Sequence, residues 1–109
     1  MPREGLGEFE HHVLLVILRL GGESYSMPIV LELQEVSGRE VSAAAVFIAL
    51  CRIEKTGLLT SRFDESDGEA AHSRRNFTLT PEALARLRAS RRAFVRLWSG
   101  VAGTLDKAR

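Results

Sequence analysis

The side chains best suited to bind a partner lie between Val41 and Thr80, where small, apolar and basic residues follow one another. A helix that begins with small side chains can approach DNA closely, and alanine methyl groups can contact thymine methyl groups in the major groove. Arginine binds phosphate well and reaches into narrow grooves. We therefore predict DNA-binding residues in this region, namely Ser42, Ala43, Ala44, Phe47, Ile48, Arg52, Arg74 and Arg75.

Simpler interpretations of the same residues stay open at this stage. Ser42 could serve only as a helix cap, and Phe47 could belong to the core. Arg74 and Arg75 could lie in a solvated turn, paired with the acidic residues that precede them. The sequence contains no bidentate base-reading side chain near Ser42, so we expect specificity to depend on A·T-rich sequence, DNA shape and half-site spacing.

Catalytic and metal chemistry find little support in the sequence. It contains no nucleophile–base arrangement, no glycine loop for phosphate and no dinucleotide fingerprint. His11 and His12 are adjacent, so on a helix they point about 100° apart and cannot easily chelate one ion. Cys51 is the only cysteine, which excludes an internal disulfide and fits a reducing cytoplasm. We expect no catalytic residue, no metal site and no cofactor.

Length and charge set further limits. The 109 residues suffice for one domain with a modest core, and no apolar run approaches the roughly 18 residues of a membrane span. The net charge of +1 is low for a protein that binds nucleic acid, but it is unevenly distributed. Residues 1–81 carry 8 Lys/Arg and 12 Asp/Glu, whereas residues 82–109 carry 7 and 2. Phosphate binding must therefore come from local placement of arginines.

The elements that position these residues follow from periodicity and capping signals, with Ser26, Ser42 and Thr80 as expected helix caps. We expect helices over Phe9–Leu20, from Ser26 to Gly38, over Ala43–Thr56 and from Pro81 to about Leu105, with strands over Leu58–Phe63 and Asn76–Leu79. We expect one face of the second helix to carry Ile29, Val30, Leu33 and Val36, and the inward face of the third to carry Val46, Leu50 and Ile53. The fold class is thus mainly α with a small β-hairpin. It corresponds to a winged helix-turn-helix over residues 1–80 and a C-terminal dimerisation helix over 81–109, together forming one compact unit.

The last expected helix carries an apolar seam with alternating spacings of three and four, interrupted by Arg91. Such a seam at the end of a small chain favours contact with a second chain, so we predict a homodimer. The predicted interface residues are Leu84, Leu87, Phe94, Trp98, Val101 and Leu105. Trp98 is most simply a dimer anchor, and a second hypothesis makes it a stacking surface for a flat aromatic ligand.

Taken together, several motifs resemble those of the PadR family of transcriptional regulators, over roughly Leu6 to Thr80. The resemblance is carried by Leu6-Gly7-Glu8-Phe9-Glu10, Tyr25-Ser26, Val41-Ser42, Leu50, Arg52-Ile53-Glu54, Gly57-Leu58-Leu59, Arg75, Phe77 and Leu79-Thr80. It implies a cytoplasmic, dimeric winged-helix repressor that binds double-stranded DNA at an inverted-repeat operator. It also implies a small aromatic or lipophilic effector. Phe47 and Ile48 depart from the family's usual tyrosine and proline, and the wing is acidic.

Three other functions remain alternatives at this point. The first is a winged-helix protein-interaction module that has lost DNA binding, which the acidic wing and the departures at Phe47 and Ile48 slightly favour. The second is a regulator of MarR or ArsR type, which would differ in dimer topology and metal response. The third is an enzyme, for which the sequence offers no site.

Overall fold

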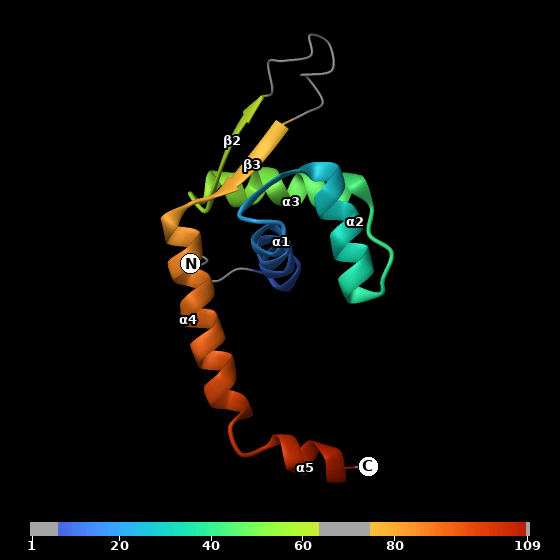
Figure 1. Ribbon diagram of the computed structural model, residues 1–109, viewed down its shortest axis with the longest axis vertical. Helices are drawn as coiled ribbons and strands as arrows, with labels where there is room; N and C mark the ends of the chain where they lie inside the picture. Colours follow the sequence, from blue (N-terminus) through green and yellow to red (C-terminus); the bar gives the residue numbers. More distant parts are fainter. Residues whose placement is uncertain (1–6, 64–74, 109) are drawn as a thin grey trace.

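The computed structural model describes residues 7–63 and 75–108, and it is mainly helical with one small sheet. Figure 1 shows α1 enclosed by the other N-terminal elements, with the sheet beside α3, while α4 leaves this body as a long arm that ends in α5. The elements are α1 Glu8–Arg19, β1 Glu23–Tyr25, α2 Ser26–Ser37, α3 Ala43–Lys55, β2 Leu59–Phe63, β3 Arg75–Leu79, α4 Pro81–Trp98 and α5 Ala102–Lys107. This order is that of a winged helix-turn-helix, as predicted.

Capping residues fix where two of the helices begin. The Ser42 hydroxyl accepts a hydrogen bond of 2.9 Å from the Ala45 amide, and the Thr80 hydroxyl accepts one of 3.2 Å from Ala83. Each bond satisfies an amide that has no partner within its own helix. The predicted caps at these positions are confirmed. The cap predicted at Ser26 is wrong, because Ser26 is the first residue of α2 and Tyr25 precedes it.

The described strands form a three-stranded antiparallel sheet in the order β1-β3-β2. Thr78 of β3 lies opposite Glu23 of β1 on one side and Thr60 of β2 on the other. The predicted hairpin is therefore present, but β1 was not predicted. A strand of three residues is too short to show an alternating pattern, and its pairing depends on β3, which is about 50 residues away in the chain.

The core lies where α1, α2, α3, the sheet and the first turns of α4 meet. Its buried apolar residues include the predicted inward face of α3, formed by Val46, Leu50 and Ile53. Phe77 is the largest fully buried side chain, and α4 contributes Ala83 and Leu87. The prediction that Val36 lies on the inner face of α2 is wrong, because Val36 is 50% exposed. None of the helices in the described part of the chain is long and apolar enough to span a membrane.

The prediction of one continuous C-terminal helix to about Leu105 is wrong. The α4 helix ends at Trp98, and Gly100 adopts φ 81°, a left-handed conformation that breaks the helix and that L side chains rarely adopt. The α5 helix then begins at Ala102. The heptad seam is therefore interrupted after Trp98. The projecting arm gives the molecule its long axis of 57 Å, against 30 and 28 Å for the other two.

Candidate nucleic-acid interface

One face of α3 is buried and the other is exposed to solvent; we call the exposed side the bare face of α3. Core residues of α3 hold the helix against α1 and the sheet, while Ala43, Ala44 and Ile48 are exposed on its other sides. Ile48 is 56% exposed and gives this face a large aliphatic side chain. The capped first turn and the small side chains at its start leave room for a close approach. This face is suited to lie in a groove of DNA.

Phe47 lies on the side of α3 that faces the wing. Its ring packs edge-on against that of Phe77, with 6.4 Å between centroids and 76° between planes, yet 41% of the residue remains exposed. The two interpretations of Phe47 from the sequence are thus combined. Part of the ring closes the core, and part of it extends the bare face of α3.

Arg75 joins the wing to α3 through its own chain. Its guanidinium donates hydrogen bonds of 2.8 Å to Glu54 of α3 and 2.9 Å to Ser61 of β2. The same group lies 5.2 to 5.8 Å from the ring centroids of Phe47, Phe63 and Phe77. These two bonds and the three rings orient the guanidinium toward Glu54 and Ser61 of its own chain, so the predicted DNA contact of Arg75 gains no support from its geometry.

Ser61 completes this arrangement from the other strand of the wing. Its hydroxyl donates to the second carboxylate oxygen of Glu54 at 2.8 Å while it accepts from Arg75. Glu54 therefore receives one bond from each wing strand. We call Glu54, Ser61 and Arg75 the wing latch. The sequence offered Glu54 only as part of a family motif and Arg75 as a DNA-binding candidate, and it gave no sign of their pairing.

Arg52 lies on the opposite side of α3, toward α1. Its guanidinium pairs with Glu10 at 3.2 Å, but 65% of the Arg52 side chain is exposed. The Glu10 side chain is only 16% exposed, but the arginine faces solvent, so screening weakens the pair and a phosphate can compete for the guanidinium. The structure therefore leaves Arg52 available at the edge of the α3 face. Arg74 lies outside the described residues, as do the acidic residues that were expected in the wing.

Two further exposed cations were not among the predicted DNA-binding residues. Lys55, in the last turn of α3, follows Ala44 and Ile48 at helical spacing, so all three share the outer face. Arg62 of β2 is exposed on the wing. The periodicity of α3 could have identified Lys55, whereas the exposure of Arg62 depends on how the sheet packs.

The predicted dimer residues divide into two groups. Leu87 is buried in the core of its own chain, and Leu84 packs against that core. The later residues of the set remain exposed, with Phe94 at 63%, Trp98 at 45%, Val101 at 44% and Leu105 at 58%. Their neighbours Val95 and Leu97, and Leu15 and Leu18 on α1, are exposed as well.

No group of three or more His, Cys, Asp or Glu residues in the described part of the chain could hold a metal ion. His11 lies 3.4 Å from the Ser90 hydroxyl of α4. Burial, with a smaller contribution from His12, lowers the pKa of His11 below its ordinary value of 6.5.

Comparisons with known proteins place this geometry among regulators. Family models and curated proteins gave no significant match. A solved PadR family transcriptional regulator from Eggerthella lenta DSM 2243 is 26% identical, with a TM-score of 0.67 over 88% of this chain and 82% of that one. F93 from STIV, a winged-helix DNA-binding protein, has a TM-score of 0.71 at 9% identity and covers 89% and 98% of the two chains.

A third structure is the organohalide-sensing transcriptional regulator RdhR-CbdbA1625 in its 2,4-dichlorophenol-bound form. It has a TM-score of 0.71 at 17% identity, covering 96% of this chain and 54% of that one. At such low identity, this structure and F93 establish the fold alone.

The order and packing of the elements define a winged-helix protein. Within that class the chain is a PadR-like transcriptional regulator. The neighbours are regulators or DNA-binding proteins, which agrees with a function other than catalysis.

Proposed function

We propose that the protein is a homodimeric, ligand-responsive transcriptional repressor that binds an inverted-repeat operator in the cytoplasm. The observation that carries this proposal is the bare face of α3, which is capped by Ser42 and anchored by a fully buried opposite face. In this proposal α3 enters the major groove and the β2–β3 wing lies on the DNA backbone. The contacting residues are Ser42, Ala43, Ala44, Phe47, Ile48 and Arg52, joined by Lys55.

The exposed apolar residues of the arm support the homodimer. Large hydrophobic side chains along α4 and α5 are unlikely to remain in water on a stable monomer, because contiguous apolar patches of this kind usually mark an interface. Leu15 and Leu18 of α1 add to the exposed surface. A partner chain would cover Phe94 and Trp98 and would fix the distance between the two α3 helices.

The effector part of the proposal rests on the fold neighbour with bound dichlorophenol and on the family resemblance. A ligand that binds one arrangement of the two α3 helices better than another shifts the population competent to bind DNA. Trp98, 45% exposed, is our candidate for contact with a flat aromatic ligand.

Spacing of the operator half-sites tests the DNA-binding proposal directly. Duplexes selected from a random library by the wild-type protein should contain two inverted half-sites about one helical turn apart. Inserting about five base pairs between them rotates one half-site to the far face of the DNA, so tight binding should be lost. Binding that is indifferent to this insertion, or selection that yields no common sequence, would favour a protein-interaction module instead.

A further inference from the structure

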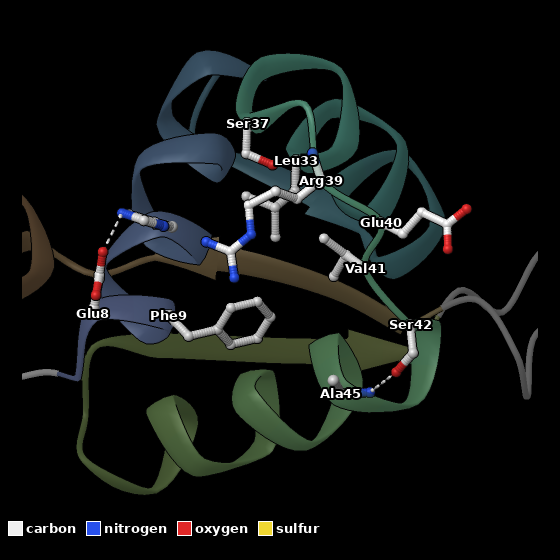
Figure 2. A pocket seen from close by; sticks show the side chains of 10 residues that line it. Glu8, Phe9, Leu33, Ser37, Arg39, Glu40, Val41, Ser42 and Ala45 are labelled. Carbon is white, nitrogen blue, oxygen red and sulfur yellow. Dashed lines mark hydrogen bonds and ion pairs between the residues drawn. The ribbon is translucent and has the colours of Figure 1, made fainter.

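A cavity of about 240 Å³ lies between the start of α1, the end of α2 and the turn that leads into α3. Figure 2 shows the Phe9 ring on one side of this space, with Leu33 and Val41 on the other. Ala45, in the first turn of α3, adds a small apolar surface. Polar side chains, among them Glu8, Ser37 and Glu40, line the rest of the cavity, and Ser42 is the one predicted DNA-binding residue in the lining.

One cation faces this space. Arg39 extends from the turn before α3 back toward Phe9 and α1, while its neighbour Glu40 points away from the cavity (Figure 2). No carboxylate in the described part of the chain forms an ion pair with Arg39. His12 also lines the cavity, and its nearest carboxylate, Glu8, is 3.9 Å away with 85% of its side chain exposed. The site thus combines three apolar side chains with a guanidinium that forms no ion pair with the described carboxylates, although Glu8 and Glu40 also line the cavity.

We propose that this cavity binds a small monocarboxylate, with the carboxylate on Arg39 and the apolar body against Phe9, Leu33 and Val41. The planar guanidinium matches a carboxylate through two parallel hydrogen bonds, a geometry that a neutral or cationic ligand cannot use. A cavity of about 240 Å³ has room for a single ring or a short branched chain.

Occupancy of the cavity would act on the turn that sets the start of α3. Three side-chain hydrogen bonds hold that turn: the Val41 amide donates to Gln34 at 3.2 Å, the Arg39 amide donates to the Ser37 hydroxyl at 3.2 Å, and the Ala45 amide donates to the Ser42 hydroxyl. A ligand that binds Arg39 while resting on Phe9 would tie the turn to α1 as well. This effect on α3 rests on the proposed DNA binding, whereas the proposed carboxylate site does not.

Calorimetric titration of the full-length protein, without DNA, tests the site. Isovalerate, hexanoate and benzoate serve as probes, and their neutral amides serve as matched ligands without the charge. We expect at least one carboxylate to bind in the millimolar range or tighter, and its amide to bind at least tenfold more weakly. In two-dimensional NMR spectra the shifted backbone amides should include those of Phe9, Val41 and Ala45.

Two variants and one control make the assignment specific. Arg39→Gln should weaken carboxylate binding at least tenfold, and Ala45→Leu should do so by filling the cavity. Arg88→Gln removes the same charge from an exposed position on α4 and should leave binding unchanged. The proposal is overturned if no carboxylate binds, if the amides bind equally well, if Arg39→Gln binds like the wild type, or if the shifted amides lie elsewhere. Because DNA is absent, failure here leaves the regulator proposal intact.

Discussion

Replacing Arg75 with alanine should destabilise the protein by far more than an ordinary surface substitution. The Arg75–Glu54 pair has side chains that are only 27% and 28% exposed, and the distance between them is 2.8 Å. Hydrogen bonds to charged groups contribute about 1.5–3 kcal/mol, and a cation–π contact at a partly exposed site adds about 0.5–1 kcal/mol. These terms overlap and are partly screened by solvent. We expect Arg75→Ala to lower the free energy of unfolding by about 2–3 kcal/mol.

Thermal unfolding followed by circular dichroism measures this effect. For a domain of this size each kcal/mol shifts the midpoint by about 4–8 °C, so Arg75→Ala should unfold about 10 °C or more below the wild type. Arg52→Ala is a matched control, because it removes an arginine–glutamate pair of 3.2 Å whose arginine is 65% exposed. Glu10 in that pair is 16% exposed and also accepts a hydrogen bond from the Gly7 amide, so with solvent screening at the arginine the loss should be about 1 kcal/mol.

A double-mutant cycle with Glu54→Gln separates the pair from its surroundings. If the wing latch acts as a unit, Arg75→Ala should lower the free energy of unfolding by less in the Glu54→Gln background than in the wild type. The slope of log DNA affinity against log salt gives an independent measure, since a lost phosphate contact reduces it by about one. We expect Arg75→Ala to leave that slope unchanged. Equal destabilisation by Arg75→Ala and Arg52→Ala, together with a flatter slope, would refute the latch and restore Arg75 as a phosphate ligand.

Three further predictions concern the α3 face, the arm and pH. Ala44→Glu places a carboxylate on the outer face of α3, so it should abolish DNA binding in a gel-shift assay. The melting temperature should stay near that of the wild type. Retained binding would mean that α3 does not enter the groove. Phe94→Ala combined with Trp98→Ala should give monomers in analytical ultracentrifugation, and a wild-type monomer at tens of micromolar would contradict the dimer. Because burial lowers the folded-state pKa of His11 below 6.5, the unfolded chain takes up the proton first. Stability should therefore fall as pH drops through about 6.5 toward the folded pKa, and His11→Gln should flatten this dependence in pH-resolved denaturant titrations.

Local signals were enough to predict most helix boundaries and the class of fold. Ser42, Thr80 and Gly38 act through the backbone groups next to them, so their effect can be deduced from the sequence alone. The inward face of α3 also follows from a repeat within a single helix. The same repeat identifies the outer face, because what is not buried on one side of the helix must lie on the other.

The break between α4 and α5 shows where a repeat misleads. The spacing of apolar residues continues through Trp98, Val101 and Leu105, which predicts one helix. Gly100 interrupts it, since the left-handed backbone at that residue ends the helix whatever the side-chain pattern. Leu87 belongs to the same repeat, yet it is buried in its own chain because the body of the domain reaches that far along α4.

Only the tertiary structure decided the roles of the residues that meet across the chain. The sequence determined that the protein has a capped, alanine-rich helix followed by two strands and a basic C-terminal helix, because those features depend on neighbouring residues. It could not determine that Arg75 pairs with Glu54, 21 positions away, or that Arg39 extends toward Phe9 across a cavity. Such contacts depend on how the sheet and helices pack, and packing brings together side chains whose separation in sequence carries no periodic signal.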